Sequence, residues 1–229
     1  MLKCRLVKPS LGALVVAMGA AGSAAGQECG SLESHYGPFD FRVNRDKLPI
    51  VENFHFSPKV QALVRGDTSV TPGPDIEYVL KTFPNHPAAL VAITKWARIK
   101  KSMQPSDLKY SVDCHFKRAL RFRSDDGVVR MLYAQWLNQT SRKSEALQQV
   151  SSVDAKGNPQ TISNLGLLYL ELGEPEKALA QAHAVQALGY PVTMLKAALE
   201  KAGRWRDADP TSAEQPASAA GATASAAAR

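Results

Sequence analysis

The sequence predicts an all-α protein built from about three stacked helical hairpins, and three observations support this fold class. Apolar residues between positions 74 and 204 recur at intervals of three and four, which places them on one face of a helix. The pattern at 133–146 returns at 165–178, so the same unit is repeated along the chain. Glycine and proline stand between the patterns, where helices end.

Residues 1–26 have the pattern of an export signal. Positive charges at Lys3, Arg5 and Lys8 precede a short apolar run, and small residues at 23–26 offer a cleavage site. The alternative is an uncleaved anchor, although the run is short and rich in glycine for that role. We expect a cleaved signal and export into a bacterial periplasm.

The net charge of the chain does not by itself indicate a particular class of binding partner. The formal net charge is +7, and the signal contributes three positive charges, so residues 27–229 carry 7 − 3 = +4. That mild excess does not require a nucleic acid. No apolar run reaches the roughly 18 residues of a membrane span. We therefore expect no nucleic-acid partner and at most peripheral contact with a membrane.

Residues 27–73 form an N-terminal block that contains aromatic and turn residues but little periodicity, so an irregular fold is expected. Within it, Ser57 and Pro58 are typical of a helix start and predict one short helix. Cys29 and Cys114 remain after removal of the signal. Two cysteines in an oxidising compartment favour one disulfide, which would tie this block to the helices.

The repeat domain is expected to span residues 74–205, and its pattern is best developed after Ile162. Ile162, Leu165 and Tyr169 share one helical face. Gly166 lacks a side chain and leaves room for a neighbouring helix. Gly173 ends this first helix, because glycine adopts the left-handed conformation readily. A second helix with small apolar residues follows.

This unit resembles the tetratricopeptide repeat, a helix-turn-helix of about 34 residues. The residues that carry the resemblance are Ile162, Leu165-Gly166, Tyr169 and Ala178. An earlier unit matches in the same phase at Tyr133-Ala134, Leu137 and Ala146, and a first unit opens at 83–90 with an insertion at 100–109. A lone helix at 75–82 is expected before the repeats, and a capping helix at 192–202 after them. Residues 206–229 lack large apolar side chains and are expected to form a disordered tail.

The resemblance also implies a binding groove, because the first helix of each repeat lines the inner surface of such a stack. The groove residues that it implies are Lys95, Arg98, Met131, Gln135, Asn138, Gln139, Asn164, Leu167 and Leu170. Amide side chains beside apolar ones suit an extended peptide, whose backbone needs hydrogen-bond partners. We expect a non-catalytic adaptor or scaffold that binds a protein or peptide in the cell envelope, without cofactor or metal. The alternative is that residues 29–73 fill the groove.

A second hypothesis rests on charge. Residues 98–123 carry eight positive and two negative charges. The segment is either a solvated helix face or a patch that docks an acidic protein, a polyanion or a membrane surface. The candidate patch residues are Lys117, Arg118, Arg121 and Arg123.

The third hypothesis is an accessory enzyme subunit with a site around Tyr36, Asp40 and His55. The sequence contains no nucleophile motif, phosphate-binding loop or histidine pair with ligand spacing. We therefore do not expect an enzyme.

Overall fold

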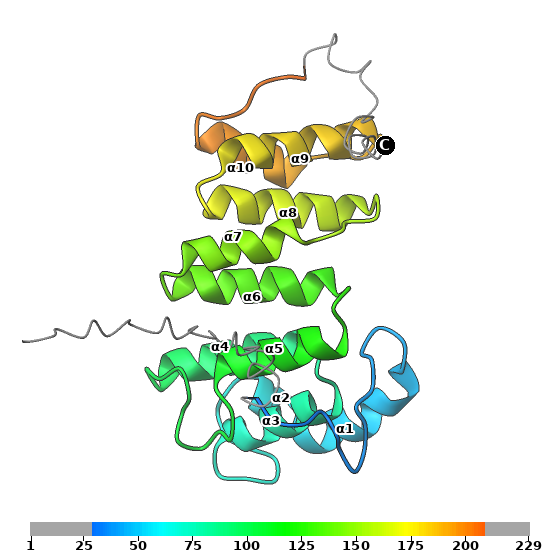
Figure 1. Ribbon diagram of the computed structural model, residues 1–229, viewed down its shortest axis with the longest axis vertical. Helices are drawn as coiled ribbons and strands as arrows, with labels where there is room; N and C mark the ends of the chain where they lie inside the picture. Colours follow the sequence, from blue (N-terminus) through cyan, green and yellow to red (C-terminus); the bar gives the residue numbers. More distant parts are fainter. Residues whose placement is uncertain (1–28, 209–229) are drawn as a thin grey trace, which may run out of the picture.

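The computed structural model describes residues 29–208, and within them it contains α-helices, one 3-10 helix and no strand (Figure 1). The predicted all-α class is therefore confirmed. The 3-10 helix η1 spans Arg45–Lys47. The ten α-helices of this part are α1 (Leu48–His55), α2 (Pro58–Gln61), α3 (Pro72–Thr82), α4 (Pro87–Ile99), α5 (Val112–Phe122), α6 (Gly127–Gln139), α7 (Lys143–Ser151), α8 (Pro159–Glu171), α9 (Pro175–Ala187) and α10 (Thr193–Lys201). The predicted export signal at 1–26 lies outside the described residues.

Helices α6 to α10 stack along the long axis of the molecule (Figure 1). Helix α6 packs against α7, and α8 packs against α9, so each pair forms a helical hairpin. Helix α6 also contacts α4 on one side and α8 on the other, which joins the pairs. Helix α10 covers α8 and α9 at the C-terminal end, as expected for the predicted capping helix.

Three helices of the stack repeat one design. Helices α4, α6 and α8 each have 13 residues. The side chains of His86, Asp126 and Asn158 stand directly before them, and each accepts a hydrogen bond from the backbone N–H three residues later. Helix α6 begins at Gly127 and α8 at Pro159, the same offset that relates the two sequence patterns. The interval from α4 to α6 is longer because of the predicted insertion after residue 99.

One apolar core runs through the whole stack. Its fully buried side chains include Ile76 of α3, Leu90 of α4, Phe116 of α5 and Leu137 of α6. Gly166 of α8 permits the close approach that its sequence position predicted, because a Cβ atom there would clash with the side chain of Leu195 in α10. Another glycine, at position 173 with φ +69°, follows the end of α8 in the left-handed conformation.

The N-terminal block is more regular than predicted. It contains α1, and α3 begins at Pro72, inside the block expected to be irregular. Proline is compatible with a first helical turn because the N–H groups there have no partner within the helix. Leu48 and Val51 are both buried, and their spacing of three is the signal that could have revealed α1. Ser57 does precede α2, but its hydroxyl donates to Asp67 and does not cap the helix.

The ordered chain also extends slightly further than predicted at the C-terminus. Arg206 was assigned to the tail, yet its guanidinium pairs with Glu176 of α9. Its carbonyl lies 2.9 Å from His183 Nε2. The first residues of the predicted tail therefore pack on α9, and residues 209–229 lie outside the described part.

Candidate functional site

Three adjoining cavities form a groove along α4 and α6. The first has a volume of about 350 Å³ and shares Val91, Lys95 and Leu132 with the second, of about 90 Å³. The second shares Arg98 and Gln139 with the third, of about 220 Å³. We call this continuous depression the α4/α6 groove. Its position agrees with the predicted location of a groove on the first helix of each repeat.

The floor of the α4/α6 groove is rigid. Trp136 lines both the second and the third cavity and is only 3% exposed. Its indole N–H donates to Asp113 Oδ1 of α5 at 2.9 Å. Arg142 holds the same carboxylate through two hydrogen bonds of 2.6 and 2.7 Å. The indole ring is therefore held in place from behind by a bidentate ion pair.

The walls combine three kinds of chemistry. Val91 and Leu132 supply apolar surface, and Gln135 supplies an amide. Lys95 and Arg98 supply two positive charges on α4, three residues apart on one face. Both cations are exposed, and no carboxylate among residues 29–208 forms an ion pair with either of them. The groove can therefore offer apolar contacts, amide hydrogen bonds and two available positive charges.

The structure brings together some of the predicted groove residues. Lys95, Arg98, Gln135 and Gln139 line the second cavity. Met131 is buried in the core, so its assignment to the groove lining was wrong. Asn138 is only partly exposed and lines none of the three cavities.

The predicted residues of the last repeat lie elsewhere in the stack. Asn164 is exposed and accepts a hydrogen bond from Gln160 on its own helix. Leu167 and Leu170 are partly buried against the core. These side chains do not line the α4/α6 groove, so the cavities cover only part of the predicted surface.

The N-terminal block closes one end of the groove without filling it. Phe56 and Gln61 line the first cavity beside Val91. Glu52 of α1 lies 3.0 Å from His86 Nε2 at the start of α4, which fixes the block against this end. The block therefore borders the first cavity, while the second and third cavities along α4 and α6 have no lining residue from it.

The predicted disulfide is present between Cys29 and Cys114, with an S–S distance of 2.11 Å. It attaches the start of the described chain to α5. The same helix binds this segment through its arginines: Arg118 Nη1 donates to the carbonyls of Cys29 and Ser31 at 2.9 and 2.6 Å. Arg121 donates to the backbone carbonyl at position 30.

The contacts of Arg118 with the N-terminal segment correct the predicted basic patch. Arg118 is 4% exposed and cannot belong to a solvated face. Arg123 forms an ion pair with the buried Asp40 at 2.7 Å. Lys117 is exposed. Charge counting alone misplaced Arg118, because its carbonyl partners lie 87 and 89 residues away in the sequence.

The three residues of the enzyme hypothesis lie in separate networks. Asp40 binds arginines and an asparagine. His55 lies 2.8 Å from Asp75 and stacks on Tyr78. Tyr36 packs edge-to-face on a neighbouring phenylalanine. Neither Tyr36, Asp40 nor His55 lines any of the three groove cavities.

Comparison of the chain with models of known protein families, with curated proteins and with solved structures finds no match. The function must therefore be argued from the chain itself. Between residues 29 and 208, no three histidine, cysteine, aspartate or glutamate side chains are grouped so that they could hold a metal ion. None of the helices in this part is long and apolar enough to cross a membrane.

Proposed function

We propose that this protein is an exported, non-catalytic adaptor of the tetratricopeptide type, which holds an extended peptide segment of a partner in the cell envelope. The repeated design of α4, α6 and α8 supports the repeat assignment, together with the offset between α6 and α8. The Cys29–Cys114 disulfide supports export, because such bonds persist mainly in oxidising compartments.

The observation that carries the proposal is the continuity of the α4/α6 groove. Three adjoining cavities suit successive side chains of an extended peptide better than one compact ligand. Gln135 and Gln139 provide donors and acceptors for the peptide backbone. Because the indole of Trp136 is already fixed, little side-chain entropy is lost there on binding.

Lys95 and Arg98 indicate the charge of the partner. Both are exposed and lack an ion-pair partner within the described residues. A peptide that carries a carboxylate beside apolar side chains would place the carboxylate between Lys95 and Arg98. Its apolar side chains would then contact Val91 and Leu132. The preferred segment is therefore an acidic, partly apolar one.

A peptide-display selection against the purified full chain tests the proposal. Selected peptides should combine acidic and apolar residues, and their affinity should fall about tenfold or more in Lys95→Glu/Arg98→Glu, since two attractive charges become repulsive. Lys201→Glu is the matched control, because this exposed lysine lies on α10, at the far end of the stack (Figure 1). It should not change the affinity.

Two results would refute the proposal. One is a selection that yields no binding peptide. The other is a set of peptides that bind the double variant as well as the wild type, which would place their site outside the α4/α6 groove. Circular dichroism should give the same helix content for all three proteins, because every substituted side chain is exposed.

A further inference from the structure

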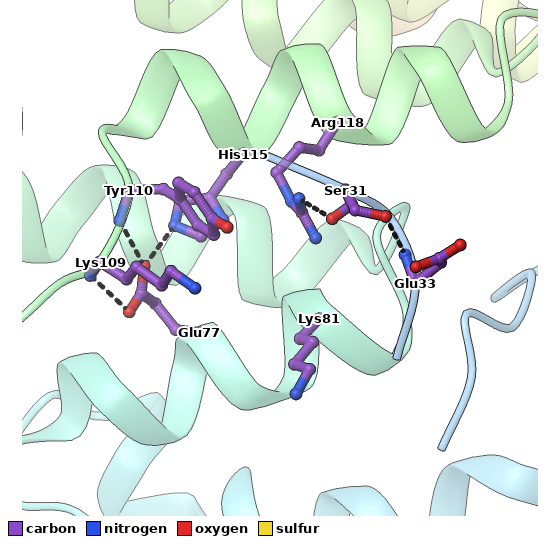
Figure 2. Close-up of a pocket in the computed structure, with 8 residues that line it drawn as sticks. All are labelled: Ser31, Glu33, Glu77, Lys81, Lys109, Tyr110, His115 and Arg118. Carbon is purple, nitrogen blue, oxygen red and sulfur yellow. Dashed lines mark hydrogen bonds and ion pairs between the residues drawn. The ribbon is translucent and has the colours of Figure 1, made fainter. Parts of the chain in front are cut away.

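A separate cavity of about 350 Å³ lies between the N-terminal segment, α3 and α5 (Figure 2). It shares no lining residue with the α4/α6 groove. One wall is the segment that the disulfide attaches to α5, and it includes Ser31 and Glu33. Volumes of this size are at the lower end of the range for small-molecule sites, which is roughly 300–1,000 Å³.

Arg118 is the buried charge of this cavity. One terminal nitrogen, Nη1, makes both hydrogen bonds to the N-terminal segment. The other, Nη2, donates to no group among residues 29–208. The guanidinium carbon also lies 4.9 Å from the centroid of the Tyr110 ring. Because Arg118 is only 4% exposed, its charge is poorly solvated, and an anion in the cavity would interact with it strongly. Burial lowers the pKa of Arg118, which is the expected effect of this desolvation.

One of the two carboxylates in the lining of the cavity already has several partners. Glu77 accepts the backbone N–H groups of Lys109 and Tyr110 at 2.8 and 3.0 Å. It also lies 3.0 Å from His115 Nε2. Burial alone would raise the pKa of Glu77, but these partners hold it below its usual range. Glu77 therefore remains charged and orders the loop before α5, while its oxygens are not free for the lysines.

Two lysines also belong to the lining of the cavity. Lys81 of α3 forms no ion pair within the described part of the chain. The ammonium of Lys109 lies over the ring of Tyr110, 5.2 Å from its centroid. Glu33 is the other acidic residue of the lining, and Figure 2 shows its carboxylate pointing away from Lys81. The cavity thus gathers three positive side chains from three segments around one open volume.

We propose that this cavity binds a small organic anion, with Arg118 Nη2, Lys81 and Lys109 as donors to its oxygen atoms. Carboxylates and phosphates share this chemistry, and both accept hydrogen bonds from guanidinium and ammonium groups. The ring of Tyr110 gives the ligand's carbon skeleton an apolar wall. The disulfide has a direct role in such a site, because it holds the segment that forms one wall.

Isothermal titration calorimetry on the full chain, with succinate, citrate and inorganic phosphate at constant ionic strength, tests this proposal. At least one probe should bind, and Lys81→Gln/Lys109→Gln should weaken it about tenfold. If succinate or citrate binds more tightly than phosphate, the ligand is a carboxylate. If phosphate binds more tightly, the ligand is a phosphate compound. Lys201→Gln is the control, because it removes an exposed lysine of α10 that lines none of the cavities described above, and it should leave the affinity unchanged.

Three results would overturn the proposal: no binding of any probe at millimolar concentration, unchanged affinity in the double variant, or an equal loss in Lys201→Gln. The last would mean that the anions only screen surface charge. Amide NMR spectra offer a second readout that does not depend on any variant. Shifts should centre on Ser31, Tyr110 and Arg118, and shifts confined to α4 and α6 would also reject the site.

Discussion

The guanidinium of Arg123 and the carboxylate of Asp40 are 2.7 Å apart, although 83 residues separate them in the sequence. Asp40 is 3% exposed and also accepts hydrogen bonds from Arg42 and from Asn85. Asn85 donates in addition to Asp126, the residue that caps α6. This network connects the N-terminal block to the loops before α4 and α6.

The network predicts a loss of stability in acid. Burial alone would raise the pKa of Asp40, but hydrogen bonds from Arg42, Asn85 and Arg123 hold it well below its usual range. Because the folded-state pKa is depressed, the stabilisation is fully present above the unfolded pKa of about 4. It is lost as pH falls through the folded-state pKa. Asp75 adds to the same trend: burial would raise its pKa, but hydrogen bonds, first among them that of a threonine, lower it to about 2.

Asp40→Asn should therefore lower the free energy of unfolding at pH 7 by about 2 kcal/mol, since it breaks a buried, charge-assisted network. Between pH 5 and 2 the variant should lose less stability than the wild type. Urea unfolding followed by circular dichroism measures both effects. Asp46→Asn is the control, because Asp46 is exposed and, among residues 29–208, its ion-pair partner is the adjacent Lys47. Equal acid sensitivity of Asp40→Asn and wild type would contradict this account.

Reduction of the disulfide should destabilise the fold. Cys29 and Cys114 close a loop with a sequence separation of 85 residues, for which loop-closure entropy gives an upper figure of about 4 kcal/mol. Urea unfolding with and without a phosphine reductant should show that reduction lowers the free energy of unfolding, by up to about 4 kcal/mol. Cys29→Ser/Cys114→Ser should match the reduced wild type and should not respond to the reductant. A wild type whose stability does not change with the reductant would mean that the bond does not constrain the unfolded chain.

The contrast between Gly166 and Arg118 shows how much of this molecule the sequence predicts. Gly166 belongs to a local repeat, so its close contact with another helix could be expected from spacing alone. The helices of the stack were predictable for the same reason, because helical periodicity is local. Arg118 instead depends on the carbonyl groups of Cys29 and Ser31, far away in the sequence, and no local pattern indicates such a contact.

The candidate sites divide in the same way. The resemblance to the tetratricopeptide repeat implies Lys95 and Gln135 as groove residues, and both line the α4/α6 groove. It implies Asn164 as well, but the cavities do not extend to that residue, because groove depth depends on side-chain packing between neighbouring helices. The cavity around Arg118 needs the N-terminal segment as a wall, so it could not be found from the helices alone.

Gly166→Ala should destabilise the C-terminal end of the stack. The new Cβ would meet the Cδ2 atom of Leu195, which is 1% exposed and has little space in which to move. Overpacking of this kind costs about 1–3 kcal/mol, and the better helix propensity of alanine offsets up to about 1 kcal/mol of that loss. Urea unfolding should show a net loss of about 1 kcal/mol in the free energy of unfolding. Gly166→Ala/Leu195→Ala should relieve the clash, so additive losses from the two substitutions would contradict this explanation.

The ion pair between Arg142 and Asp113 should be stronger than other surface pairs of this protein. Two short hydrogen bonds join them, and Asp113 also accepts the indole N–H of Trp136. Both side chains are less than 30% exposed, so solvent screens the pair only partly. A double-mutant cycle with Arg142→Ala and Asp113→Ala should give a coupling energy of about 1–2 kcal/mol.

The pair Lys196 and Glu200 provides the matched control for that cycle. Their charged atoms are 3.8 Å apart on one exposed face of α10, where a coupling of no more than about 0.5 kcal/mol is expected. Arg142 and Asp113 hold Trp136 in the groove floor. Arg142→Ala should therefore also lower the affinity for the peptides selected on the α4/α6 groove, whereas Lys196→Ala should not change it. Equal coupling energies in the two cycles would show that the bidentate geometry adds nothing. Unchanged peptide affinity in Arg142→Ala would show that the indole keeps its position without the ion pair.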